Sequence, residues 1–213
     1  LGGWDTVSAG AVDRTMTIGA SSAATLGATA DWTYGPAADV TPTTAAADRA
    51  LVTDGFYAPL TIDTQDPETG VGHTVTFADP LVARGDVIKT GAGTLVLASD
   101  GNSFSHRLDV RGGAVRCTVS QTVPELLLAQ GTSLSCGADA VLTADSDVDI
   151  SGVTFGEPAV ACEYVTVLAV TDGHEITGVP EAVRGLKTRI MPLSEGGQAV
   201  QVRKGGGMLL LVR

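Results

Sequence analysis

The residues best suited to proton transfer near neutral pH are three histidines, His73, His106 and His174. They are far apart in the sequence, and each lies in or beside a turn signal. No His-x-x-His pair and no nucleophile at a diagnostic spacing accompanies any of them. A metal ligand or a general base is one interpretation of these side chains, and a histidine on the protein surface is the favoured one.

Carboxylates recur at every second residue from Asp145 through Asp147 to Asp149, with Asp139 nearby. Alternate residues of a strand share one face, so this row could offer oxygen ligands to a calcium ion. The spacing matches neither the EF-hand loop nor the glycine-rich nonapeptide of calcium-binding β-helices. We therefore predict a solvated strand face, and neither a metal nor a cofactor.

A further acidic group could serve a carbohydrate-cleaving enzyme. Asp63, Asp66 and Glu68 would supply the acids, and Arg49 or Lys89 the basic group, of a polysaccharide lyase. This interpretation depends on β-helices being a common scaffold for that chemistry, which is an argument from fold analogy. The sequence favours a protein without catalytic residues.

Aromatic side chains that stack on sugar rings would support the same carbohydrate function. The candidates are Trp4, Trp32 and Tyr34, and the last two alternate on one strand, so that their rings share a face. The same pair could equally cover one end of a hydrophobic core. A carbohydrate-binding or carbohydrate-cleaving β-helix is thus the alternative to a structural or adhesive protein.

The three cysteines, Cys117, Cys136 and Cys162, are too few for a disulfide scaffold and lack the C-x-x-C pairs of a zinc site. Segments 108–117 and 127–136 match in their apolar, glycine and cysteine positions at an offset of 19 residues. On adjacent coils the two terminal cysteines would be about 4.8 Å apart, within the Cα range of a disulfide. We predict a Cys117–Cys136 disulfide; the alternative is a ladder of buried thiols.

The elements that must position these residues are short strands. The 213 residues include 27 glycines, 44% are hydrophobic, and only 4% are aromatic. This composition predicts many strands, frequent turns and a thin core of small side chains. A repeat of about twenty residues, with a strand, a glycine turn and a strand in each unit, is the period of a parallel β-helix. We predict an all-β fold, a right-handed parallel β-helix (β-solenoid).

The chain divides into three predicted regions. Residues 1–86 form an N-terminal β region with an Ala/Thr/Pro-rich loop near 36–47, residues 87–155 form the β-helix repeat core, and residues 156–213 form a closing β region. The single helical turn that we predict lies at Pro180–Leu186, between a proline and a glycine stop.

Net charge and hydropathy exclude two classes of partner. The formal charge of −11 repels nucleic acid and anionic membrane surfaces, so we expect neither as a partner. No apolar run approaches the ~18 residues of a membrane span. The chain starts at Leu1, and we expect it to be a processed product or a fragment with any export signal upstream.

Three consecutive segments carry a family resemblance, namely Lys89–Leu97 (KTGAGTLVL), Ser99–Phe104 (SDGNSF) and Leu108–Val115 (LDVRGGAV). Together they resemble the autotransporter-associated β-strand repeat of bacterial surface proteins. Ser103 and Ser105-His106 stand where that family has turn glycines, and we expect no membrane barrel to follow. These departures favour a secreted multi-repeat surface protein over a complete autotransporter. Weaker matches follow at 119–128, 138–142, 165–170 and 208–212.

The resemblance implies a non-catalytic, extracellular β-helix at the cell surface, with a structural or adhesive role. A rod of this kind ends in open strand edges, which can pair with another chain. The run Leu209, Leu210 and Leu211 is the predicted assembly edge, because no charge interrupts it before Arg213. The expected partners are further copies of the chain, in an oligomer, filament or layer, and surface glycans or other surface proteins.

Overall fold

The computed structural model describes residues 16–18, 23–35, 50–53, 58–158 and 163–205. Within these ranges every regular element is a β-strand, and there is no helix. The predicted all-β class is confirmed. The predicted helical turn at Pro180–Leu186 is wrong: Gly185 adopts a positive φ of 84°, and the Leu186 N–H donates to the Val183 carbonyl, which closes a β-turn there.

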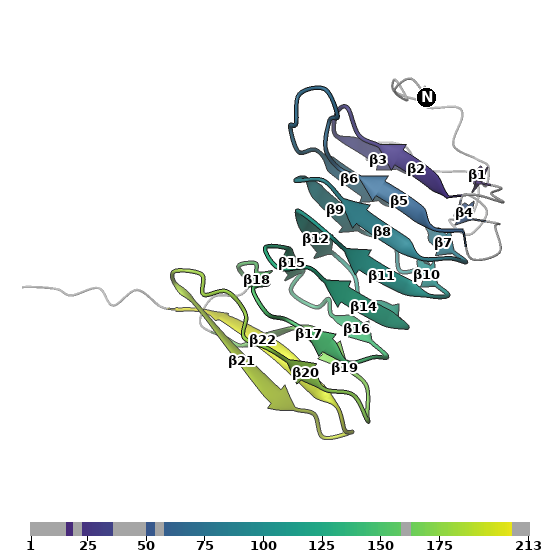
Figure 1. Cartoon of the computed structure of the whole chain (residues 1–213). Helices are drawn as coiled ribbons and strands as arrows, with labels where there is room; N and C mark the ends of the chain where they lie inside the picture. Colours follow the sequence, from purple (N-terminus) through teal and green to yellow (C-terminus); the bar gives the residue numbers. More distant parts are fainter. Residues whose placement is uncertain (1–15, 19–22, 36–49, 54–57, 159–162, 206–213) are drawn as a thin grey trace, which may run out of the picture.

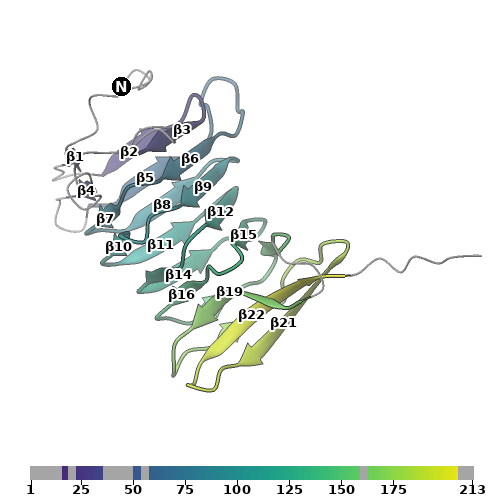
Figure 2. The same cartoon turned by 180° about the vertical axis from the view of Figure 1, so that it is seen from behind.

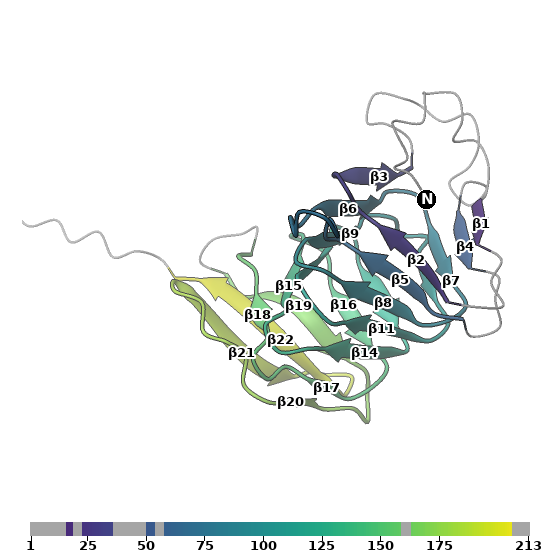
Figure 3. The ribbon, with the colours of Figure 1, turned by 45° about the horizontal axis from the view of Figure 1, so that its top comes forward.

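The strands stack in a coil of three. Most strands pair in parallel with the strand three places further along the chain, so every third strand belongs to the same face (Figure 1). Only a chain that winds repeatedly in one direction produces this order, which is the arrangement predicted for a β-solenoid. Figure 2 shows the same stack from behind, and Figure 3 looks partly along it, with the three faces around the interior.

The first face is hydrogen-bonded from β1 to β10 and again from β13 onward, and β10 contacts β13 across the gap. Its strands are β1 (Met16–Ile18), β4 (Leu51–Thr53), β7 (Leu81–Ala83), β10 (Ser103–Phe104), β13 (Gln121–Val123), β16 (Leu142–Ala144) and β19 (Val165–Val170).

The second face is one sheet from β2 to β14, followed by the pair β17 and β20. Its strands are β2 (Ala24–Gly27), β5 (Leu60–Asp63), β8 (Val87–Thr90), β11 (Arg107–Val110), β14 (Glu125–Leu128), β17 (Val148–Asp149) and β20 (Ile176–Thr177).

The third face is a single sheet of parallel strands. Its strands are β3 (Trp32–Tyr34), β6 (Thr74–Phe77), β9 (Thr94–Leu97), β12 (Ala114–Cys117), β15 (Ser133–Cys136) and β18 (Thr154–Phe155). None of the three faces is interrupted in its pairing at residues 86 and 87, where the sequence suggested a change of region.

The register of the third face confirms the predicted repeat of about twenty residues. Thr94 pairs with Ala114, and Ala114 with Ser133. Cys117 and Cys136 are partners at the offset of 19 residues. The offset of 19 residues does not hold on the second face, where Leu108 pairs with Leu126 and not with Leu127. The turn after β14 is one residue longer than the turn after β11 and absorbs the difference.

The interior consists of rows of small side chains, one residue per coil. Val75, Leu95, Val115, Leu134 and Phe155 occupy successive positions of one row on the third face, and all are buried. Outward neighbours alternate with them, as the period of two requires. Each fully buried side chain of this size contributes roughly 1.5–3 kcal/mol, and the coils share this stabilisation along the whole stack.

The C-terminal end of the first face changes direction. β22 (Gln198–Lys204) pairs antiparallel with β19, and β21 (Leu186–Pro192) pairs antiparallel with β22. This hairpin extends beyond the last coil at the end of the molecule opposite to β2 and β3 (Figure 1). Among the described residues β21 has no strand on its outer side, so it is the edge of that sheet.

Candidate functional site

Lys89 occupies an interior position, in the row between Ile62 and Val110. Its side chain is buried, and its Nζ donates to the carbonyls of Thr90, Gly91 and Gly112 at 3.0, 2.8 and 2.7 Å. Burial lowers the pKa of Lys89 from 10.5 to about 8, although the nearby charge of Asp63 opposes the shift. The ammonium group thus joins the turns of two successive coils.

The predicted acid–base set comes together only in part, because Asp63 lies near Lys89 while the other members do not join them at one site. Asp66 and Glu68 lie on the loop between β5 and β6, where Asp66 accepts hydrogen bonds from the N–H groups of Glu68 and Thr69. These two bonds lower the pKa of Asp66. Asp63 accepts from the Gln65 N–H, and Lys89 points to the interior. Arg49 lies outside the described residues.

The aromatic pair faces inward. Trp32 and Tyr34 share one face of β3, as predicted, and both are partly buried against the core. Their ring centroids are 5.8 and 6.0 Å from that of Phe77 on the next coil. These rings close the interior at the first coil of the third face. Trp4, the other predicted sugar-stacking residue, lies outside the described residues.

Cys117 and Cys136 extend the inward row that begins at Phe77 and Leu97. Both are buried free thiols, and Cys136 Sγ donates to the Val167 carbonyl at 3.1 Å. The hydrogen bond between the two thiols raises the pKa of Cys117, and burial adds to the increase. The predicted disulfide stays a prediction. Cys162 lies outside the described residues.

The acidic row does not lie on a single strand. Asp145 and Asp147 belong to the turn between β16 and β17, and Asp149 ends β17. All three carboxylates are exposed or largely exposed, in agreement with the solvated surface that we predicted. The prediction of one strand face is wrong because the chain turns a corner of the coil at Asp145.

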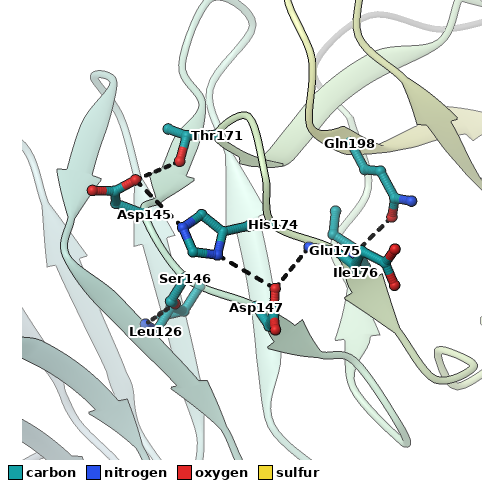
Figure 4. A network of polar contacts seen from close by, with 9 residues as sticks. All are labelled: Leu126, Asp145, Ser146, Asp147, Thr171, His174, Glu175, Ile176 and Gln198. Atoms are coloured by element: carbon teal, nitrogen blue, oxygen red, sulfur yellow. Dashed lines mark hydrogen bonds and ion pairs between the residues drawn. The ribbon is translucent and has the colours of Figure 1, made fainter.

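His174 lies between two of these carboxylates (Figure 4). Its Nδ1 is 3.4 Å from Asp147 Oδ1, its Nε2 is 3.7 Å from Asp145 Oδ1, and the Thr171 hydroxyl donates to Asp145. The Glu175 N–H donates to Asp147 at 2.9 Å and is the main reason that the pKa of Asp147 is lowered; His174 adds to it. This network fastens one corner of the coil to the next.

The other two histidines are separate from this network. His73 Nδ1 is 3.5 Å from Asp31 Oδ1, at the start of β6, while its Nε2 is buried and has no hydrogen-bond partner in the described part of the chain. His106 lies between β10 and β11. Across the described ranges, no three His, Cys, Asp or Glu side chains are grouped so that they could hold a metal ion.

A polar ladder at another corner was missed by the sequence analysis. Asn102 Oδ1 accepts from the Leu81 N–H at 2.8 Å, and its Nδ2 donates to Gln121 Oε1 at 3.0 Å. Gln121 Nε2 in turn donates to the Ser99 carbonyl at 3.0 Å. The two amides thus connect three coils. The position of Asn102 in a turn one repeat before Gln121 was the available signal.

The surface best suited to contact another molecule lies at the C-terminal hairpin, and the sequence analysis did not single it out. Val179, Val183 and Ile190 are exposed apolar side chains, and Val179 is 78% exposed. All three line one hollow, together with Phe155 and Leu186. An exposed group of apolar residues with a polar border is typical of a protein interaction site.

Arg189 lines this hollow, and Arg184 and Lys204 line the adjacent one. Arg189 stacks on the Tyr164 ring, with its guanidinium carbon 3.8 Å from the centroid, and Arg203 lies 4.9 Å from it. Arg189 also donates two hydrogen bonds to Gln201 Oε1, at 3.0 and 2.7 Å. Lys204 forms an ion pair with Glu157. Tyrosine and arginine together, beside apolar side chains, are characteristic of energetically important interface positions.

Comparison with known proteins gives no match with a family model, with a curated protein or with a solved structure. The resemblance to the autotransporter-associated repeat therefore stays a prediction. No helix capable of spanning a membrane occurs in the described part of the chain. The predicted assembly edge, Leu209 to Leu211, lies outside the described residues.

Proposed function

We propose that this chain is a non-catalytic structural or adhesive element of an exported bacterial surface protein, and that it associates with copies of itself. The observation that carries the proposal is the in-register stacking of strands on three faces around a continuous aliphatic interior. Such a stack is a stiff rod whose backbone groups are satisfied between coils. A rod presents long faces to partners.

Polar residues in the interior and at the corners of the coil have structural roles that suit this function. Lys89 joins two turns, Asn102 and Gln121 connect three coils, and His174 links two corners. Each interaction restricts the movement of one coil relative to the next. Charged or amide groups buried with satisfied hydrogen bonds also favour one register over its alternatives.

An extracellular location is supported by the resemblance of Lys89–Val115 to the repeats of bacterial surface proteins, and by the acidic, lysine-poor composition. In that setting the outward faces would contact surface glycans or other surface proteins. No cofactor is required for either role. The carbohydrate-cleaving alternative would need acids and a base around one groove, whereas Lys89 is buried with its ammonium group hydrogen-bonded to three carbonyls.

Sedimentation velocity and negative-stain microscopy of the purified chain test the proposal. We expect rods that form larger species as the protein concentration rises. A monomer at all concentrations would contradict self-association. A monomer whose melting temperature increases with one particular glycan would instead support the carbohydrate-binding alternative.

A further inference from the structure

Charge is distributed unevenly along the chain. Residues 1–83 contain ten acidic and two basic residues, a net charge of −8, whereas residues 184–204 contain five basic residues and one acidic residue, a net charge of +4. The five basic residues are Arg184, Lys187, Arg189, Arg203 and Lys204. A molecule with a net charge of −11 thus carries one concentrated positive region.

The described members of the two charged regions lie toward opposite ends of the stack (Figure 1). Asp31, Asp66 and Glu68 belong to the first coils, between β2 and β3 and between β5 and β6, and we call them the acidic end. Asp31 is 74% exposed, and Glu68 lies exposed on its loop. The other end consists of β21 and β22, which carry four of the five basic residues, and of Arg184 just before β21; we call it the basic hairpin.

The basic hairpin combines charge with the other features of an interface. Its centre is the hollow lined by Val179, Val183 and Ile190, with Arg189 in the lining and with Arg184 and Lys204 in the adjacent hollow. Its outer strand β21 has no neighbour among the described residues. An apolar centre favours a folded protein surface over a bare anionic polymer, because the latter would leave the apolar residues exposed to water. Glu181 lies in the same lining and Glu157 pairs with Lys204, so these two carboxylates offset part of the positive charge.

We propose that the basic hairpin of one copy binds the acidic end of a second copy, so that the rods associate head to tail. This inference rests on the proposed function and identifies the surfaces that produce the self-association. A contact between two different surfaces of the same chain leaves one surface of each kind open, so it extends into a filament wherever its rotation does not close a ring. Opposite charges at the two ends also orient the approaching copies.

Sedimentation velocity of the full chain tests this contact at two salt concentrations. The association should weaken between about 50 mM and about 500 mM NaCl, because exposed charges are screened at the higher ionic strength. Lys187→Glu at the basic hairpin should weaken it by at least about tenfold at low salt. Arg116→Glu, an exposed strand residue in the middle of the rod with the same change in charge, is the matched control and should leave it within about twofold of the wild type.

A charge-swap experiment identifies the partner surface. Glu68→Lys at the acidic end should also weaken association, and an equal mixture of the Lys187→Glu and Glu68→Lys proteins should form filaments again, since each altered end then meets its complement. Filaments that persist in both variants and at high salt would overturn the head-to-tail contact but leave self-association intact. A wild-type protein that is monomeric throughout would overturn both proposals, as would assembly that requires an added anionic polysaccharide.

Discussion

At the scale of single residues, Lys89 is the clearest case of a polar group placed inside the fold. Alternate residues of a strand share one face, so Lys89 lies on the inward face of β8 together with Val87. This alternation was already visible in the sequence. Lys89 was considered as a base only because β-helices are a common scaffold for polysaccharide lyases. The carbonyls that accept hydrogen bonds from its ammonium group could not be predicted, because Gly112 belongs to the next coil.

The lowered pKa of Lys89 predicts an unusual dependence of stability on pH. Below about pH 8 the lysine is protonated in the folded and unfolded states alike. Between about 8 and 10.5 the unfolded chain retains a proton that the folded chain has lost, so the free energy of unfolding rises with pH. Relative to Lys89→Met, the wild type should gain up to about 1.4 kcal/mol per pH unit across this window, or about 3 kcal/mol in all.

Urea denaturation of the two proteins from pH 7 to pH 11 provides the measurement. The comparison with Lys89→Met removes the contributions of all other groups that titrate in this range, because they are common to both proteins. Parallel stability curves across the window would show that Lys89 is solvated. A wild-type curve that falls relative to the variant would mean that its pKa is raised.

The buried thiols give a second prediction at this scale. In a Cys162→Ser background, the native protein should react very slowly with a thiol reagent, because Cys117 and Cys136 are buried and the pKa of Cys117 is raised. After unfolding without reductant, two reactive thiols per chain correspond to the free form, and none to the predicted disulfide. Oxidised samples are the informative comparison, since strand spacing of about 4.8 Å places the two residues near the range of a disulfide.

At the scale of elements, the turns decide how the coils fit together. Gly113 and Gly131 occupy the corresponding turns of successive coils, with φ of 64° and 81°. A Cβ on Gly113 would meet the carbonyl oxygens of Gly93 and Gly91 in the preceding coil, whereas a Cβ on Gly131 would have nothing within 4 Å. A side chain at Gly131 would therefore meet only backbone strain, whereas a side chain at Gly113 would meet backbone strain and a collision with the preceding coil.

Alanine at these positions should have different costs. Gly131→Ala should lower the free energy of unfolding by about 1–2 kcal/mol, the usual cost of a left-handed backbone for a residue with a side chain. Gly113→Ala should lower it by a further 1–3 kcal/mol or so, because the backbone of the preceding coil must move as well. Chemical denaturation of both variants is the measurement. Equal losses would show that the turn at Gly113 has room to relax.

The sequence predicted the strand register on one face of the coil and misplaced it by one residue on another. The cysteine echo gave the correct register for β12 and β15, since both strands end in the same residue type at the same phase. The partner of Leu108 was misplaced by one residue, because an extra turn residue before Thr132 has no signature in the hydrophobic pattern. Leu127, which the echo placed inside, is 38% exposed.

At the scale of the whole molecule, each coil contacts mainly its immediate neighbours, so stability should vary along the stack. Native-state hydrogen exchange should be slowest in β8, β9, β11 and β12, which have paired strands on both sides. It should be fastest in β21, whose outer side has no described neighbour and which is largely exposed. Uniform protection across all strands would contradict this gradient and indicate one cooperative unit.

The winding of the chain was predictable from the sequence, whereas its end was not. Small apolar residues that recur about every twenty residues indicate the coils of a solenoid. The strands of residues 58–86 pair in parallel with those of the core, although their sequence lacks the repeat motif. The reversal at β22 depends on the antiparallel pairing of Val165–Val170 with Gln198–Val202, which alternation alone cannot distinguish from parallel pairing. The charged end that this reversal produces was therefore missed.

The antiparallel hairpin at β21 and β22 also determines how the molecule can change in evolution or by engineering. Because the reversal is confined to the final element, a duplicated unit of twenty residues inserted among the middle coils would leave both termini of the stack unaltered. Each insertion would lengthen the particle by about 4.8 Å, one strand spacing. The length of the stack can therefore change while the surfaces at its two ends stay the same.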